Sequence, residues 1–230
     1  MQLNRKNFFN QLTSLVDSDS KILLGFSGGS DSTALLILLS KVLAKENLHA
    51  IHINHNLNDY SLKFERFSRK FCSDNNVSLT VIEESRNNIT NESDEMWGRR
   101  IRYKNFQSLV NDLGFDFIAT AHHANDNFET VLMNLDNGCS INGIRGIPER
   151  NKNIIRPLLR FKKKDILKYM HQSSINYIDD PSNEDISIKR NFIRKNIMTK
   201  IEALDDKYID KLSLISMKST LAVTKLHSII

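Results

Sequence analysis

Short apolar runs alternate with segments of helical periodicity over the first half of this chain, and that alternation constrains the fold more than any other feature. Four apolar runs have the length of strands, at residues 21–26, 48–53, 78–82 and 117–121. Three segments with helical spacing lie between them, at residues 31–44, 61–75 and about 93–113. Strands that alternate with helices pair in parallel and carry helices on both faces of the sheet. The sequence therefore predicts an α/β fold with a doubly wound, Rossmann-like parallel sheet.

The pattern changes toward the end of the chain, where apolar residues keep helical spacing from about residue 184 onward. We therefore expect a main domain over residues 1–183 and a helical extension or linker over residues 184–230. Two long loops are also predicted, over residues 86–93 and 136–153, because polar residues and glycines gather there.

Composition narrows the class of protein. The chain has 230 residues, 40% of them hydrophobic, which suits one ordinary domain with a small appendage. The longest apolar stretch, residues 34–39, is too short to cross a bilayer, and the first residues lack a signal-peptide pattern. Cys72 and Cys139 lack the spacing of a disulfide framework or a structural metal site. We expect a cytoplasmic protein with no membrane association.

Charge is distributed unevenly along the chain. Residues 151–230 contain 16 Lys and Arg against 9 Asp and Glu, a balance of +7, whereas residues 1–150 carry −2 of the total of +5. A basic segment favours a polyanionic partner such as nucleic acid, although solvated helix faces explain such charge equally well.

A glycine-containing loop joins the first predicted strand to the first predicted helix. It consists of Ser27, Gly28, Gly29, Ser30, Asp31 and Ser32. Glycines let backbone amides turn toward one point, the hydroxyls add donors, and the helix N-terminus adds partial positive charge, which together predict a phosphate or pyrophosphate site. A plain helix cap is the alternative. The Asp31 carboxylate would repel a phosphate unless a cation lies between them, which suggests Mg²⁺.

A second polar cluster occupies residues 121–130, at the end of the fourth predicted strand. His122, Asp126 and Glu129 are spaced by four and three, which predicts one shared helical face, with His123 close by. Such a face could hold a metal, bind a substrate ammonium or move protons. A solvated helix start, where acidic residues favour the helix dipole, is the alternative.

A third candidate face lies on the helix predicted over residues 93–113. Glu95, Arg99 and Arg102 share one side of it, so that a carboxylate could hold one arginine while the other reaches a phosphate. A surface salt-bridge ladder is the alternative.

These motifs together resemble a known family. Residues 27–32 resemble the Ser-Gly-Gly-x-Asp-Ser loop of the PP-loop ATP-pyrophosphatases, and residues 121–130 resemble the second signature of the tRNA(Ile)-lysidine synthetases. Further stretches match that family in order, at residues 52–57, 95–103, 156–159, 180–183 and 190–194. Asn125 departs from it, because the family usually has Asp there, and residues 138–140 read Gly-Cys-Ser where it has Gly-Ser/Thr-Gly.

The resemblance implies a fold, a reaction and a set of functional residues. The fold would be adenine nucleotide alpha hydrolase-like. The enzyme would use ATP to adenylate an isoleucine tRNA with a CAU anticodon, release pyrophosphate, and join L-lysine to C2 of the wobble cytidine as AMP leaves. The implied ATP-binding residues are Ser27, Gly28, Gly29, Ser30, Asp31, Ser32 and His55, with Mg²⁺ at Asp31. The implied catalytic residues are Asp31, His122, His123, Asp126 and Glu129, and the implied tRNA- or substrate-binding residues are Arg99, Arg102, Arg190, Asn191 and Arg194.

Two alternatives stay open at this stage. A tRNA 2-thiocytidine synthetase would use the same loop, but sulfur transfer needs paired thiolates or a cluster, which the spacing of Cys72 and Cys139 does not offer. A catalytically inactive nucleotide- or RNA-binding relative is the other, prompted by the altered residues 136–140. Longer members of the family carry a C-terminal tRNA-binding portion, which we expect to be absent or reduced to residues 184–230. The oligomeric state is open, with a homodimer among the options.

Overall fold

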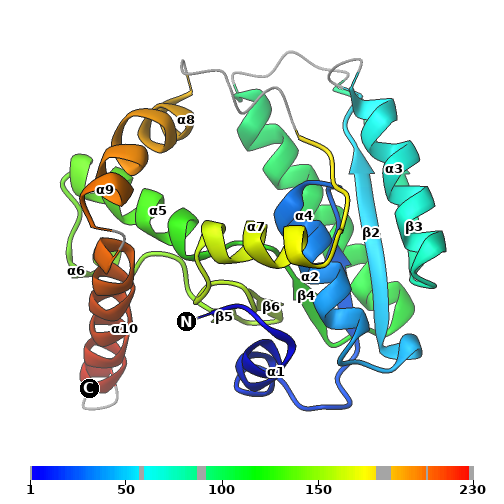
Figure 1. Cartoon of the computed structure of the whole chain (residues 1–230), viewed down its shortest axis with the longest axis horizontal. Coiled ribbons are helices and arrows are strands. Elements are labelled where there is room, and N and C mark those ends of the chain that lie inside the picture. Colours follow the sequence, from blue (N-terminus) through cyan, green and yellow to red (C-terminus); the bar gives the residue numbers. More distant parts are fainter. Residues whose placement is uncertain (1, 57–59, 87–91, 180–187, 206, 228–230) are drawn as a thin grey trace.

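The computed structural model of the chain describes residues 2–56, 60–86, 92–179, 188–205 and 207–227 (Figure 1). Six strands form one sheet in the order β3-β2-β1-β4-β6-β5. The strands are β1 (Ile22–Gly25), β2 (Leu48–Asn54), β3 (Ser78–Glu83), β4 (Phe117–Ala119), β5 (Arg150–Asn151) and β6 (Ile154–Ile155). All neighbouring strands pair in parallel except β5 and β6. The predicted α/β class is therefore confirmed.

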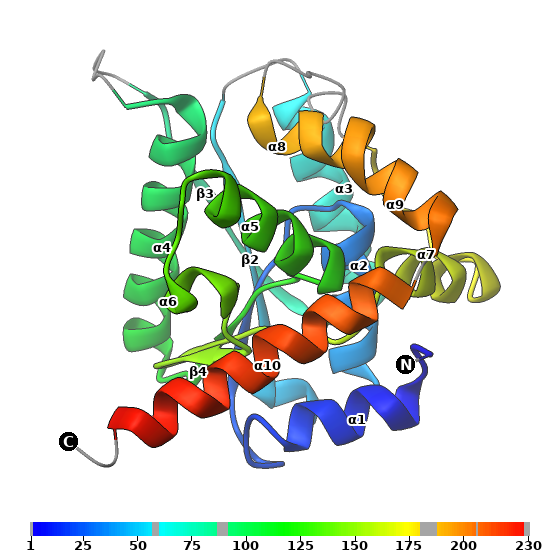
Figure 2. The same cartoon turned by 90° about the vertical axis from the view of Figure 1, so that its left-hand side faces the viewer.

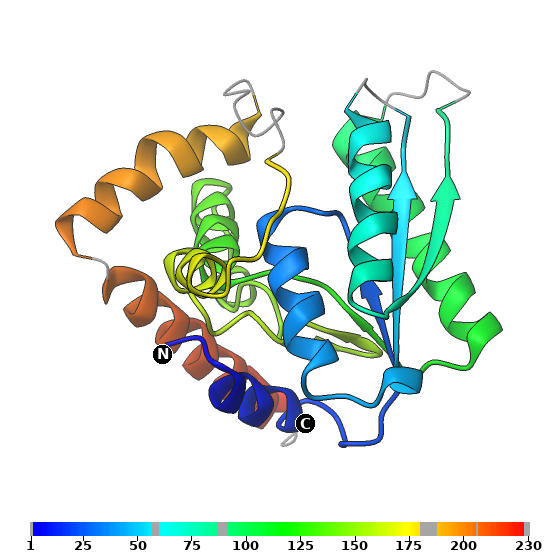
Figure 3. The ribbon, with the colours of Figure 1, turned by 45° about the vertical axis from the view of Figure 1, so that its right-hand side comes forward.

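Helices cover both faces of this sheet. They are α1 (Arg5–Thr13), α2 (Ser30–Ser40), the 3-10 helix η1 (Lys45–Asn47), α3 (Ser61–Asp74), α4 (Asp94–Leu113), α5 (Ala124–Asp136), α6 (Ile141–Ile144), α7 (Lys163–Gln172), α8 (Lys189–Phe192), a π-helical segment (Ile193–Met198), α9 (Thr199–Leu204) and α10 (Lys207–His227). In Figure 3, α2 and α3 lie on one side of the sheet and α4 on the other.

The alternation of side chains along the strands explains this layering. Leu24 of β1 belongs to the larger apolar core, which α1, α2 and α7 complete, whereas its neighbour Leu23 belongs to a second core against α4. Helix α2 is buried on nearly all sides because it lies between the sheet and α7. Its apolar residues therefore show no single hydrophobic face, unlike those of α3.

Two segments differ from what the sequence predicts. The loop predicted over residues 136–153 is wrong in part, because it contains α6 and β5 and leads into β6. These elements are too short to produce a periodic signal, and the two strands are defined only by their pairing, β6 with β4 and β5 with β6. Part of the other predicted loop, residues 87–91, lies outside the described residues.

The C-terminal helices pack onto α5. Ile193, Met198 and Ile209 form an apolar cluster with Ala124 and Phe128 of α5. In Figure 1, α8, α9 and α10 lie with α5 on the side of the molecule opposite β3, and in Figure 2 this side faces the viewer. The boundary predicted at residue 183 lies outside the described residues. Within the part of the chain that the structure describes, no helix has the length and apolar character needed to span a membrane.

Candidate active site

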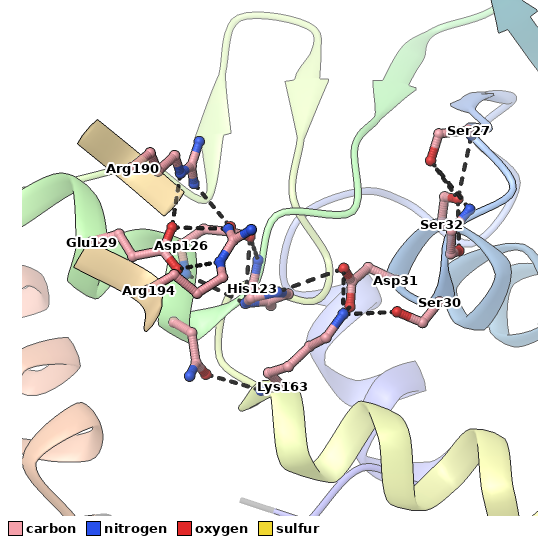
Figure 4. Close-up of polar contacts among 12 residues, drawn as sticks. Ser27, Ser30, Asp31, Ser32, His123, Asp126, Glu129, Lys163, Arg190 and Arg194 are labelled. Carbon is pink, nitrogen blue, oxygen red and sulfur yellow. Dashed lines mark hydrogen bonds and ion pairs between the residues drawn. The ribbon is translucent and has the colours of Figure 1, made fainter. Parts of the chain in front are cut away.

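The strand order reverses at β1, whose neighbours are β2 on one side and β4 on the other. Ligands of open α/β sheets bind beyond the carboxyl ends of the strands at such a switch point. The loop after β1 leads into α2, and the segment after β4 leads into α5. Figure 4 shows side chains from both segments meeting there, together with Lys163 of α7 and two arginines from the chain around α8.

The predicted phosphate loop forms a closed turn. Gly28 has a φ of +85°, which favours glycine, and a Cβ built on it would lie 3.2 Å from the Phe67 ring. The Ser27 and Ser32 hydroxyl oxygens are 3.0 Å apart, and the Ser32 hydroxyl donates to the Gly29 carbonyl at 3.1 Å. The Gly28 carbonyl accepts from the backbone of Ile178 at 3.0 Å. The loop is therefore preformed by its own serines and by the chain that follows α7.

Asp31 lies in the first turn of α2, and the ammonium group of Lys163 lies beside it. The Lys163 Nζ contacts both Asp31 carboxylate oxygens at 2.6 and 2.8 Å, and it donates to the Ser30 hydroxyl at 2.7 Å. Burial alone would raise the pKa of Asp31, but His123 and Lys163 outweigh it and hold that pKa well below its usual value. The Asp31 carboxylate is therefore ionised, and the adjacent Lys163 ammonium balances its negative charge.

Lys163 is the residue that sequence reasoning missed. It lies within a run of three lysines, residues 162–164, that reads as a solvated charged segment. It is separated from Asp31 by 132 positions, so no local spacing could pair them. The sequence feature that could have indicated Lys163 is its position shortly after residues 156–159, one of the stretches that match the family.

His123 joins the phosphate loop to the second cluster. It is the N-cap of α5: its Nδ1 accepts from the Asp126 backbone at 3.3 Å, and its own backbone donates to the Asp126 carboxylate at 2.8 Å. Its Nε2 lies 3.7 Å from an Asp31 oxygen. Burial lowers the pKa of His123, but the carboxylates of Asp126 and Asp31 outweigh it, so that the net pKa is raised above the ordinary value.

His122 does not share the helical face that its spacing predicts. Helix α5 begins at Ala124, so His122 precedes the helix, and its Nδ1 lies 3.0 Å from the Thr120 hydroxyl. Burial lowers the pKa of His122 to about 4, and the nearby Arg156 and Arg190 also disfavour its protonation. The predicted helical face that His122 would share with Asp126 and Glu129 is wrong, because α5 begins after His122. The lowered pKa makes His122 a neutral imidazole near neutral pH.

Asp126 and Glu129 do share one face of α5, and two arginines cover them. Arg190 donates through Nε to Glu129 at 2.8 Å and through a terminal nitrogen to Asp126 at 2.8 Å. Arg194 donates to the two Glu129 oxygens at 2.9 and 3.0 Å. The Glu129 side chain is 1% exposed, against 26% and 41% for Arg190 and Arg194. Arg190 and Arg194, two of the four arginines predicted to bind tRNA or substrate, therefore face the carboxylates, and the neighbouring Asn191 is buried.

The remaining predicted residues lie around α4, and the charge of Arg99 is close enough to His122 to disfavour its protonation. The Arg99 guanidinium lies over the Tyr103 ring, 5.1 Å from its centre, and the carboxylate-bound arginine of this helix is Arg100, which pairs with Glu92 at 2.9 Å. The sequence prediction let Glu95 hold either arginine, and in the structure the Glu95 charge acts on Arg102, where it opposes the larger effect of burial on the pKa. The Arg102 side chain keeps an exposed surface, and desolvation by the protein around it lowers its pKa.

His55 lies beside this group, at the end of β2. Its ring meets Trp97 edge-on at 5.4 Å between centres, and burial together with Arg102 lowers the pKa of His55 to about 4. Its Nδ1 is buried with no hydrogen-bond partner among the described residues. His55 is therefore a neutral ring near neutral pH, and its buried Nδ1 has unused hydrogen-bonding capacity among the described residues.

Comparisons with known proteins identify the family of the chain. The model of the PP-loop domain family matches residues 1–201. The tRNA(Ile)-lysidine synthase of Chlorobaculum tepidum is 36% identical over 88% of this chain and 63% of the relative, and that of Bacteroides thetaiotaomicron is 33% identical over 91% and 47%. The enzyme of Caldanaerobacter subterraneus is 34% identical over 82% of this chain and 42% of the relative. The chain thus spans about half the length of the curated relatives it matches.

Solved structures support the fold alone. A U34-tRNA thiolase from Methanococcus maripaludis superposes with a TM-score of 0.78 at 17% identity, covering 93% of this chain and 76% of that one. An NH₃-dependent NAD synthetase from Campylobacter jejuni gives a TM-score of 0.52 at 17% identity. The family model matches most of this chain, and the phosphate loop lies at the switch point of the sheet. The chain therefore belongs to the PP-loop domain family, and this membership implies ATP binding.

Proposed function

We propose that this chain catalyses the ATP-dependent joining of L-lysine to C2 of the wobble cytidine in a CAU-anticodon isoleucine tRNA, forming lysidine. One observation carries the proposal: His123 lies between Asp31 and Asp126, and Arg190 joins Asp126 to Glu129, so that the phosphate loop and both carboxylates belong to one polar network. A phosphate site joined in this way to a pair of carboxylates suits a reaction that activates one substrate with ATP and then attaches an amine. The similarity to tRNA(Ile)-lysidine synthases supports this choice of substrates.

In the first step, the C2 oxygen of the cytidine attacks the α-phosphate of ATP. The bond between the α-phosphorus and the bridging oxygen breaks, and its electron pair leaves with pyrophosphate. The amides and hydroxyls of residues 27–32 would hold the phosphates, and the N-terminus of α2 would stabilise their charge. His55 would contact the nucleoside.

Magnesium fits this site through Asp31. Among the described residues no group of three or more His, Cys, Asp or Glu side chains gathers to hold a metal ion. Mg²⁺ commonly needs only one or two carboxylates, because substrate phosphates and water complete its shell, and Asp31 supplies one. When bound there, Mg²⁺ would offset the charge of the phosphates.

In the second step, the lysine amine attacks C2 and AMP leaves. Asp126 and Glu129 would hold the ammonium and accept the proton that the amine loses. Both carboxylates carry the guanidinium groups of Arg190 and Arg194 in this structure, so lysine must displace at least part of those contacts. Phosphates of tRNA are suitable alternative partners for these two arginines.

The sulfur-transfer alternative finds no support in the site. Burial raises the pKa of the Cys72 thiol to about 12, which disfavours the reactive thiolate. Cys139 follows α5 at the far end from His123, so neither thiol joins the network around Asp31.

Transfer of labelled L-lysine to a CAU-anticodon isoleucine tRNA tests the proposal. Incorporation should require ATP, and the same tRNA with uridine at the wobble position should accept none. A folded protein that binds both ATP and the tRNA but transfers no lysine would contradict the proposed function and favour the inactive binding relative.

A further inference from the structure

The Lys163 ammonium makes more hydrogen bonds to the phosphate loop than a typical surface ion pair makes. Its Nζ lies 2.6 to 2.8 Å from three oxygens, two of Asp31 and one of Ser30. An ammonium has three hydrogens, so these oxygens satisfy it completely. The two side chains are 33% and 28% exposed, which leaves the pair within reach of a ligand entering from solvent.

The backbone of Lys163 is held firmly, whereas its side chain can move. The Lys163 backbone donates to the Asn125 side-chain oxygen at 2.9 Å, and the carbonyl of the buried Phe161 accepts from the Ala124 backbone at 2.9 Å. Buried Ile166 fixes the first turn of α7 in the main core. A flexible four-carbon stem on a fixed helix start lets the ammonium move without rearranging the fold.

Charge explains why a cation is needed here. Asp31 sits in a loop whose geometry otherwise suits phosphate, and a bare carboxylate there would repel a polyphosphate. Lys163 removes that repulsion, since it cancels the Asp31 charge at contact distance. The phosphates of a bound nucleotide are stronger anionic partners than one carboxylate, because they carry several charges and many acceptor oxygens.

We propose that Lys163 is a further catalytic residue that contacts the β- and γ-phosphates of ATP and the pyrophosphate that leaves. Its ammonium exchanges Asp31 for phosphate oxygens when the nucleotide binds, and this frees the Asp31 carboxylate for the cation that accompanies ATP. Lys163 keeps its proton throughout and acts only by neutralising charge. The assignment rests on the part of the proposed function in which ATP binds and releases pyrophosphate. It does not depend on which molecule receives lysine.

Binding measurements on Lys163→Met test this role without any turnover. Calorimetry with ATP, pyrophosphate and AMP, each with magnesium present, should show binding of ATP and pyrophosphate weakened tenfold or more. Binding of AMP should change less than threefold, because AMP lacks the β- and γ-phosphates. Lys168→Met is the matched control, since it removes the same charge from an exposed position of the same helix and should leave all three affinities unchanged. Wild-type affinity for ATP and pyrophosphate in Lys163→Met would overturn the proposal.

A second pair of variants separates phosphate contact from simple neutralisation of Asp31. If Lys163 only balances Asp31, then Asp31→Asn removes the need for it, and the double variant Asp31→Asn with Lys163→Met binds pyrophosphate as Asp31→Asn does. The proposal predicts that the double variant binds at least tenfold more weakly than Asp31→Asn. Lys163→Gln serves the same comparison should the methionine variant unfold, with thermal unfolding as the check. A chain that binds pyrophosphate through Lys163 but transfers no lysine would contradict the proposed function and leave this assignment standing.

Discussion

The two acidic centres of the site are neutralised in different ways. Asp31 is 28% exposed and pairs with one flexible lysine, whereas Asp126 and Glu129 are 11% and 1% exposed and pair with two arginines. An ammonium is a point charge that changes partner readily, while a guanidinium fork holds a carboxylate in one geometry. The difference indicates that the nucleotide side is ready to exchange its cation, and that the carboxylate pair on α5 is covered until its arginines find other partners.

Removing the buried carboxylate should have the largest effect. Glu129→Gln deletes the charge that both arginines contact and that the lysine ammonium would need, so lysine transfer should fall by about 10²-fold or more. Pyrophosphate binding should stay within threefold of wild type, because Glu129 does not contact the phosphate loop. Glu83→Gln, at an exposed end of β3, is the control. Equal losses of transfer and pyrophosphate binding would show that the two centres are not separable.

Removing the other carboxylate should act on the other step. Asp31→Ala should slow pyrophosphate release by about 10²-fold, since the loop loses its carboxylate for a cation. Single-turnover release of labelled pyrophosphate measures this directly. Release at the wild-type rate would eliminate a metal-binding role for Asp31.

Loosening the arginines should make the covered carboxylates more accessible. Arg194→Gln removes contacts to both Glu129 oxygens while Arg190 keeps its own, so L-lysine should bind the tRNA-free protein several-fold more tightly than it binds wild type. Equilibrium dialysis with labelled lysine gives the affinity, and Arg160→Gln is a control at a distant ion pair with Glu149. Weaker lysine binding in Arg194→Gln would instead make the arginine part of the lysine site.

The two neighbouring histidines should respond to pH with opposite signs. His123 has a raised pKa, so its contribution to the unfolding free energy is full below about pH 6.5 and is lost as pH rises through its folded pKa. His122 has a pKa lowered to about 4, so its contribution is present above about pH 6.5 and is lost as pH falls toward 4. Urea unfolding of His123→Asn and His122→Asn from pH 5 to 9 should show destabilisations that change in opposite directions. Parallel curves would contradict the assigned protonation states.

The smallest effect is expected at Asn125, which ties the two centres to the C-terminal helices. Its side chain accepts from the Lys163 backbone and donates to Glu202 at 2.7 Å. Asn125→Asp restores the residue usual in the family but sets a carboxylate against Glu202, so the unfolding free energy should fall by about 1–2 kcal/mol. Asn125→Ala should cost a similar amount by urea unfolding. An Asp variant as stable as wild type would show that Glu202 moves away freely.

The sequence predicted the parts of the site that lie within one element. The turn at Gly28 and Gly29 and the shared face of Asp126 and Glu129 depend on spacing of a few residues, and the structure contains both. The start of α5 could not be placed, because His123 is itself the cap and histidine is a rare capping residue. The contacts of Lys163 and Arg190 join elements far apart in sequence, so only the packing of α7 against α2, and of the chain around α8 against α5, brings them into the site.

In the proposed function, one site activates tRNA with ATP and then attaches lysine. Single-turnover counting of pyrophosphate released and lysine attached, on the same CAU-anticodon tRNA and in the same reaction, tests it most directly. We predict that both products form in equal amounts, that pyrophosphate appears first, and that omitting lysine leaves pyrophosphate release in place. Lysine attachment without pyrophosphate release, or pyrophosphate release at the same rate with and without the tRNA, would contradict the proposed function.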